Sequence, residues 1–251
     1  MPQEFRIQTI AKIRSDFPDK FGIPRQSGIL KDLKSQIVFE PEFRNADALR
    51  GLEEFSHLWI VWIFSENIRK EFHPTVRPPR LGGNVRKGVF ATRSSFRPNP
   101  LALSVVKIEK IENSNEGPVI TVSGADLMDG TPIVDIKPYL PYADAVPQAT
   151  GGFTDKVKFV PLSVNFPDAE LQKVAPEKRS ALLRVLSEDP RPAYQKDATR
   201  VYGFRFASYE IKFTVKENTL CVQSVSLAPY PLFPYQGNRT ISHSSECKDP
   251  L

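Results

Sequence analysis

The chain has 251 residues, of which 40% are hydrophobic and 25% are charged, and these proportions are typical of a globular protein with one large domain or two smaller ones. The longest apolar run, residues 58–64, is too short for a transmembrane helix, and residues 1–13 lack the pattern of a secretory signal, so we expect a cytoplasmic protein without a membrane partner. A net charge of +5 favours an anionic partner, whereas two distant cysteines and three isolated histidines argue against a disulfide framework and a metal site.

The N-terminal half is predicted to consist of short strands separated by stiff turns. Proline accounts for 23 residues, about 9% of the chain against an average near 5%, and proline neither continues a helix nor donates a hydrogen bond within a sheet. Alternating or β-branched residues predict strands at residues 5–13, 57–64, 101–108 and 119–123, with turns at residues 78–79, 82–83, 98–100, 115–117 and 129–130. This pattern predicts an all-β barrel or sandwich that extends to about residue 142.

The C-terminal part is predicted to be a smaller α+β domain. Small and turn-forming residues cluster at residues 147–156, where we place a domain boundary. A strand at residues 156–165, a helix at residues 176–189 and strands at residues 201–215 and 220–227 are expected, and the helix has Ala181, Leu182, Val185 and Leu186 on one face. The expected organisation is a first domain at residues 1–146, a second at residues 156–228 and a poorly ordered tail at residues 229–251.

Positive charge is concentrated in one segment of the predicted β domain. Residues 69–97 contain eight basic residues and one acid, so the remainder of the chain is net negative. A solvated surface is the ordinary explanation for such charges. However, Pro98 and Pro100 stiffen the backbone around Arg97 and Asn99, so their side chains would be presented to a ligand with little loss of entropy.

Carboxylates gather in residues 125–142. Asp129 precedes Gly130, which is ordinary turn chemistry. Asp126 and Asp135 stand beside apolar residues, which predicts partial burial. Such carboxylates could accept hydrogen bonds from ribose hydroxyls or an amino group, or could take up a proton.

Basic and aromatic side chains are interleaved in residues 191–212, a composition that suits contacts with RNA phosphates and bases. Tyr202, Phe204 and Phe206 share one strand face by their spacing, so some of these aromatic residues belong to the core. The segment therefore favours an RNA-binding face beside a packed strand.

Five stretches resemble a known family: PRQSG (24–28), RGLEEFSHLWIVWIF (50–64), RPPRLGGNVRKGVFATRSSFRPNPLALSVV (77–106), DLMDGTPIVDIKPYLPYAD (126–144) and SEDPRPAYQ (187–195). The first four resemble the TsaA-like β-barrel family, and the last resembles the C-terminal domain of its bacterial members. The resemblance implies a single-sheet β-barrel that binds S-adenosylmethionine without a metal, with the smaller α+β domain beside it. It also implies a homodimer that methylates N6 of threonylcarbamoyladenosine at position 37 of threonine tRNAs.

The resemblance also implies roles for individual residues. The implied cofactor contacts are Pro24, Arg25, Gln26, Ser65, Glu66, Arg93, Leu103, Asp126, Leu127, Met128 and Asp129. The chain departs from the family pattern at two places, since relatives often have His-Gln in place of Ser65-Glu66 and Gly in place of Ala102. A contact through the main chain at residues 65–66 would survive this difference, whereas a contact through the side chains would not.

Proton acceptance and tRNA binding are assigned to two further sets of residues. Asp126 and Asp135 are the candidates for accepting the N6 proton, with a role in holding the ribose or the methionine amine as the alternative. The expected tRNA-binding residues are Arg80, Arg86, Arg97, Arg191, Tyr194, Arg200 and Arg205. A non-catalytic RNA-binding barrel is the alternative function, and a barrel that serves only as a protein scaffold is a third.

Overall fold

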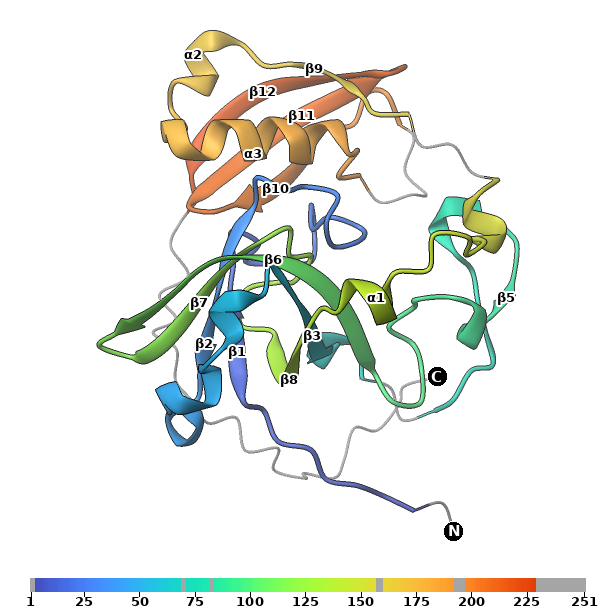
Figure 1. The fold of residues 1–251 in the computed structure, drawn as a ribbon. Helices are drawn as coiled ribbons and strands as arrows, with labels where there is room; N and C mark the ends of the chain where they lie inside the picture. The colour runs from blue at the N-terminus through green and yellow to red at the C-terminus, as the bar shows by residue number, and fades with distance from the viewer. Residues whose placement is uncertain (1–2, 69–70, 82–83, 157–159, 192–196, 229–251) are drawn as a thin grey trace, which may run out of the picture.

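The computed structural model describes residues 3–68, 71–81, 84–156, 160–191 and 197–228. The predicted mainly β architecture is confirmed, because these residues form a closed barrel with a separate four-stranded sheet and one longer helix beside it (Figure 1). No helix in this part of the chain is long and apolar enough to cross a bilayer. The expected tail, residues 229–251, lies outside the described residues.

Six antiparallel strands close the barrel in the order β1-β2-β7-β6-β3-β8. They are β1 (Ala11–Arg14), β2 (Lys34–Phe39), β3 (His57–Ile63), β6 (Leu101–Ser114), β7 (Gly117–Ser123) and β8 (Pro132–Pro138). The strands expected at residues 57–64, 101–108 and 119–123 are confirmed, and β6 is longer than expected. The strand expected at residues 5–13 is wrong for most of its length, because residues 3–8 are exposed and pairing with β2 begins at Ala11.

Two of the barrel strands, β2 and β8, were not predicted from the sequence. β2 is buried on both faces over its last three residues, so it shows no clear alternation. β8 begins and ends with proline and carries Asp135, which made it look like part of a loop. Without these two strands, the sequence pattern did not distinguish a β-barrel from a β-sandwich.

Alternation along β3 explains how the barrel core forms. Leu58, Ile60 and Trp62 point inward and are buried, whereas the residues between them are partly exposed. They pack with fully buried residues of the other strands, including Ile13 and Ile133. Each buried aliphatic side chain contributes about 1.5–3 kcal/mol relative to leaving it exposed, so this inner layer is the main source of barrel stability.

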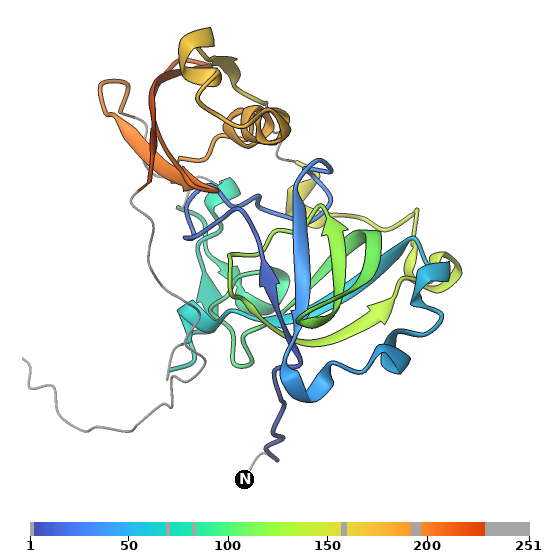
Figure 2. The same ribbon diagram turned by 90° about the vertical axis from the view of Figure 1, so that its left-hand side faces the viewer.

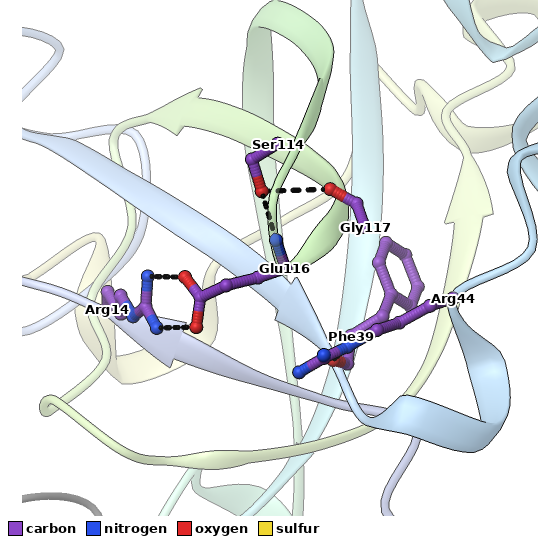
Figure 3. A network of polar contacts seen from close by, with 6 residues as sticks. All are labelled: Arg14, Phe39, Arg44, Ser114, Glu116 and Gly117. Carbon is purple, nitrogen blue, oxygen red and sulfur yellow. Dashed lines mark hydrogen bonds and ion pairs between the residues drawn. The ribbon is translucent and has the colours of Figure 1, made fainter.

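A polar network joins the β6–β7 turn to β1 at one end of the barrel (Figure 3). Arg14 donates two hydrogen bonds to the Glu116 carboxylate at 2.6 and 2.7 Å, and Ser114 accepts one from the Glu116 amide at 3.1 Å. The pair raises the pKa of Arg14 and lowers that of Glu116, because each partner favours the charged form of the other. The turn expected at residues 115–117 therefore also fixes the position of β1.

Short elements connect these strands. They are the 3-10 helices η1 (Pro41–Phe43), η2 (Ala46–Leu49), η3 (Leu52–Glu54), η4 (Ser65–Asn67), η5 (Pro79–Leu81), η6 (Val89–Ala91) and η7 (Gly152–Thr154), the α-helices α1 (Pro141–Asp144) and α2 (Asp168–Leu171), and the strand pair β4 (Thr75–Val76) and β5 (Lys87–Gly88). The β4–β5 pair lies within the basic segment, residues 69–97.

The C-terminal unit is a sheet in the order β10-β11-β12-β9, with the helix α3 (Pro176–Ser187) packed against it. Its strands are β9 (Ser163–Asn165), β10 (Tyr202–Phe206), β11 (Tyr209–Lys216) and β12 (Thr219–Leu227). The helix and its predicted buried face are confirmed. The single strand expected at residues 201–215 is wrong, because the chain turns at Ala207, which has a positive φ of 50°, and forms a hairpin. Of the strand expected at residues 156–165, only β9 forms in the described residues.

The loop that follows β1 belongs to the core of the C-terminal unit. Phe17, Leu30 and Leu33 are buried in the same apolar cluster as α3 and β10–β12, and both ribbon views show the loop between the barrel and the second sheet (Figures 1 and 2). Three ion pairs cross the same junction: Asp16 with Lys178 at 2.6 Å, Asp19 with Arg205 at 3.0 Å and Asp32 with Arg184 at 3.2 Å. Separate folding of residues 1–146 and 156–228 stays a prediction, and this shared core bears directly on it.

Candidate active site

Two glycines bring the loop of residues 24–28 against the segment that follows β7. Gly28 donates a main-chain hydrogen bond to Gly124 O at 2.8 Å, and both residues have positive φ values, 76° and 83°. A Cβ at Gly124 would lie 3.3 Å from the Gly28 backbone, so a side chain there would force the two segments apart. This contact places Gln26 close to Asp126 in space, although the two residues are far apart in the sequence.

The loop of residues 92–97 is stiffened by its own side chains as well as by proline. Thr92 Oγ1 accepts from the Ser94 amide at 3.2 Å, and Arg97 Nη1 donates to Thr92 O at 3.0 Å. The loop projects Arg93, whose Nη1 donates to Gln26 Oε1 at 2.5 Å. A guanidinium and an amide from two expected cofactor-binding motifs therefore meet directly.

Asp126 completes this cluster. Its Oδ1 accepts a hydrogen bond from Ser104 Oγ at 2.6 Å, and Ser104 Oγ in turn accepts from Trp62 Nε1 at 2.9 Å. Burial raises the pKa of Asp126, and this effect outweighs the hydrogen bonds from Ser104 and the Ser27 amide and the positive charge of Arg93, all of which lower it. A half-buried carboxylate of raised pKa beside a guanidinium is the kind of group found at functional sites.

Asp135 and Leu103 lie on the outer face of the barrel wall, away from this cluster. Val61 pairs with Leu103 on β6 and with Asp135 on β8, and residues directly opposite each other share a face. Val61 points outward because its neighbours Ile60 and Trp62 point inward. Asp135 also forms an ion pair with Lys137 at 2.7 Å, so the structure separates the two aspartates that the sequence analysis had grouped.

Two expected cofactor contacts line a cleft between the barrel and the C-terminal unit. The cleft has a volume of about 870 Å³, and Glu66 and Met128 lie on its barrel side, with Arg205 and Glu210 opposite. The main-chain oxygen of Glu66 accepts a hydrogen bond from Lys20 Nζ at 3.0 Å. This bond fixes the main chain of Ser65-Glu66, the pair that differs from the family pattern. The cleft is within the size range of small-molecule sites, about 300–1,000 Å³.

The remaining expected cofactor contacts divide into exposed, buried and structural positions. Arg25 and Ser65 are exposed, whereas Pro24 and Leu127 are buried. Asp129 accepts a hydrogen bond from the Ser15 amide at 3.0 Å, which supports the turn explanation for this residue.

Several of the expected tRNA-binding residues take part in contacts within the protein. Arg97 is bonded to its own loop, Arg191 donates two hydrogen bonds to Asp189, and Arg205 forms an ion pair with Asp19. Arg86 and Arg200 are exposed; Arg86 donates to Thr75 Oγ1 at 3.4 Å, and Arg200 lies over the Tyr202 ring. The Arg80 side chain and Tyr194 lie outside the described part of the structure.

The aromatic residues of β10 are core residues. Tyr202, Phe204 and Phe206 are buried, as their spacing predicted, so the packed strand accounts for three of the aromatics considered for base stacking. Ser27, Ser104 and Trp62 form the hydrogen bonds around Asp126 in this candidate site, and the sequence analysis did not name them. A signal was available for Ser104, because it is the only polar residue in the apolar stretch LALSVV, residues 101–106.

The donors gathered here suit an organic cofactor. One guanidinium, one amide and one carboxylate converge, and Glu66 offers a second carboxylate at the nearby cleft. Within the described ranges, no group of three or more His, Cys, Asp or Glu side chains could hold a metal ion.

Comparisons with known proteins agree over both parts of the chain. The family model of the tRNA-methyltransferase O N-terminal domain matches residues 12–145, and that of the TrmO C-terminal domain matches residues 157–228. The tRNA (adenine(37)-N6)-methyltransferase of Escherichia coli K12 is 40% identical over 221 residues, which cover 85% of this chain and 94% of that protein. A Pseudomonas aeruginosa protein whose name refers to S-adenosylmethionine-dependent methyl transfer is 39% identical over 212 residues, covering 82% of this chain and 90% of its own. The crystal structure of TrmO from Pseudomonas aeruginosa matches with a TM-score of 0.72 at 31% identity and covers 91% of this chain and 99% of that chain.

Proposed function

This chain belongs to the tRNA-methyltransferase O family, and from that premise we infer that it transfers the methyl group of S-adenosylmethionine to N6 of adenine 37 in tRNA. The observation that carries the mechanism is the cluster of Gln26, Arg93 and Asp126, in which three segments far apart in the sequence each contribute a polar group.

The cluster fits the charges of the methyl donor. S-adenosylmethionine has cationic sulfonium and ammonium groups and an anionic carboxylate. Glu66 offers a carboxylate for the cationic groups, and Arg93 offers a guanidinium for the carboxylate. The loop of residues 24–27 and the turn of residues 126–129 supply the surrounding contacts that we propose. When bound, the cofactor supplies an electrophilic methyl group.

Asp126 is our proposed acceptor for the proton that N6 loses as the new N–C bond forms. Burial raises the pKa of Asp126, so its carboxylate is a stronger base than an exposed one, and general bases act best when their pKa approaches the working pH. Asp135 suits this role less well, because it is partly exposed and paired with Lys137 on the outer face of the barrel. The remaining contribution of the site is orientation, since alignment of two bound reactants can itself supply a large part of the rate.

We further propose that the substrate is the N6-threonylcarbamoyl form of adenosine 37 in threonine tRNAs. The carbamoyl group delocalises the N6 lone pair, so such a substrate needs a base, and the site offers Asp126. The threonyl carboxylate needs a cation, and the basic segment supplies an exposed one at Arg86. Arg97 suits this task less well, because its guanidinium is bonded within its own loop.

Three further properties belong to this proposal. Large exposed apolar side chains at Phe90, Leu101 and Leu103 support a homodimer, which light scattering would test. Methyl transfer proceeds without a metal ion, so a chelator would leave the single-turnover rate unchanged. The enzyme acts in the cytoplasm, where fractionation would find it together with its tRNA substrate.

Methylation of purified threonine tRNA tests the function directly. The tRNA, carrying the threonylcarbamoyl group, is incubated with the protein and with S-adenosylmethionine that bears an isotopic methyl group. Mass spectrometry of the digested nucleosides is expected to show one labelled methyl group on N6 of the modified adenosine. Cofactor and tRNA binding without any labelled product would instead favour the non-catalytic RNA-binding barrel.

A further inference from the structure

Three side chains on neighbouring elements form a chain of hydrogen bonds that ends at Asp126. Trp62 on β3 donates to Ser104 on β6 at 2.9 Å, and Ser104 donates to Asp126 Oδ1 at 2.6 Å. An indole nitrogen can only donate, so the Ser104 oxygen accepts from it, and the Ser104 hydroxyl donates to the Asp126 carboxylate. Trp62 and Ser104 are 7% and 1% exposed, so protein groups fix this arrangement and bulk water does not.

The hydrogen bond from Ser104 favours the ionised form of the Asp126 carboxylate. An O–H···O distance of 2.6 Å lies in the range for a hydrogen bond to a charged carboxylate, about 2.5–2.7 Å. Burial works in the opposite direction and raises the pKa of Asp126. The charged group acting on Asp126 is Arg93, from the loop of residues 92–97, and the residue 24–28 loop adds the Ser27 amide. β3 and β6 contribute the uncharged Trp62 and Ser104, so Ser104 is the buried side chain that favours the ionised carboxylate from within the barrel.

We propose that Ser104, oriented by Trp62, is a positioning residue that holds Asp126 as an ionised and correctly directed proton acceptor. The proposal rests on the proposed function, in which the proton that leaves N6 passes to this carboxylate while the methyl–sulfur bond breaks and the methyl–nitrogen bond forms. Ser104 acts through Asp126. Its loss therefore changes the pH range in which Asp126 works and leaves the binding of both substrates largely intact.

Ser104→Ala and Ser104→Thr separate the hydroxyl from the packing of the site. Ser104→Ala is expected to move the acidic limb of the single-turnover pH profile to higher pH and to lower the rate on that limb about ten-fold, with a change of less than about three-fold on the plateau. Ser104→Thr keeps a hydroxyl and should retain the position of the limb. The KM for tRNA and the Kd for S-adenosylmethionine should change less than about three-fold in both variants.

A titration of Asp126 in the protein alone provides a readout that does not depend on activity. The carboxyl carbon of Asp126 is followed by NMR in protein labelled with 13C-aspartate, and its signal is identified by its loss in Asp126→Asn. The midpoint should be higher in Ser104→Ala than in the wild type and in Ser104→Thr, because a donor to the ionised form has been removed.

The two measurements distinguish failure of this inference from failure of the proposed function. An unchanged midpoint in Ser104→Ala, or a rate loss that is uniform across the pH range, would overturn the role of Ser104 and leave the methyl transfer in place. A shifted midpoint in a protein that forms no methylated nucleoside would instead support the hydrogen-bond chain and remove the proposed reaction.

Discussion

Replacing Gly22 by alanine tests whether the C-terminal unit holds the loop that carries residues 24–27. Gly22 has a φ of +86°, and a Cβ built on it would lie 2.5 Å from Cδ2 of Phe204. Gly51 is a matched control, because its φ is +87° and no described heavy atom lies within 4 Å of the corresponding Cβ position. Gly51→Ala is therefore strained only by its left-handed backbone conformation, whereas the new Cβ of Gly22→Ala also clashes with the buried Phe204 ring.

The two substitutions should differ clearly in stability. A left-handed residue with a side chain costs about 1–2 kcal/mol, so Gly51→Ala should lower the free energy of unfolding by this amount. A clash in a packed core costs about 1–3 kcal/mol more, so Gly22→Ala should lose about 2–5 kcal/mol. The Phe204 ring is 3% exposed and contacts Phe213 at 6.1 Å between centroids, so we expect the loop to move while the ring stays in place.

Urea unfolding and calorimetric binding of S-adenosylmethionine measure both consequences. Gly22→Ala should bind the cofactor about three- to ten-fold more weakly than the wild type, which corresponds to the loss of about one hydrogen bond from the displaced loop. Gly51→Ala should bind as the wild type does. Equal stability losses and equal affinities in the two variants would refute the idea that the C-terminal unit positions this loop.

Four other predictions concern the site and its substrate. Arg93→Ala should weaken cofactor binding in calorimetry by about ten-fold or more, whereas Arg86→Ala should leave it within about two-fold, because Arg93 contacts Gln26 and Arg86 lies outside the cluster. Single-turnover rates should be about ten- to hundred-fold higher on threonine tRNA that carries the threonylcarbamoyl group than on tRNA without it, and equal rates would remove the proposed substrate. A chain ending at residue 155 should keep the barrel's circular dichroism but bind the cofactor weakly, because the apolar side chains of residues 17–33 would no longer pack against the C-terminal unit. Since the pKa of Asp126 is raised above its ordinary value of 3.8, the native state binds more protons than the unfolded state as the pH rises through these two values, so the wild-type free energy of unfolding should fall relative to Asp126→Asn as urea titrations move from pH 4 to pH 7. A difference that stays constant with pH would contradict the raised pKa.

Much of the fold follows from local sequence patterns, and its exceptions have identifiable causes. The alternation on β3 and the apolar face of α3 predict both elements, because each is buried on one side only. β2 and β8 lack that alternation, since burial on both faces and terminal prolines hide it. Strand order and the closure of the barrel depend on pairing between distant segments, which no local pattern encodes.

The site could be predicted in its parts but not in its assembly. The family resemblance assigns Gln26, Arg93 and Asp126 to cofactor binding, and the structure brings these three residues together. The motifs also included Asp135, because flanking apolar residues predict burial without saying which face of a strand a side chain occupies. The β8 register, once known, assigns Asp135 to the outer face.

The surroundings of the three aspartates of residues 126–135 differ, and this difference favours a chemical role for Asp126. Burial raises the pKa of Asp129 as well, but this residue accepts the Ser15 amide in a turn and lies near the positive charge of Arg14, and Asp135 has a lysine partner on the surface, so contacts of the fold account for both. Asp126 has a raised pKa because it is half-buried, and an ionised group there destabilises the native state at neutral pH. Asp126 therefore lowers stability and yet receives a buried hydrogen bond from Ser104. Residues that oppose folding are concentrated at functional sites, so a chemical role explains Asp126 better than a structural one. Ser104 belongs to the same argument, since an apolar residue at this inward position of β6 would leave Asp126 without its side-chain donor and Trp62 Nε1 without its acceptor.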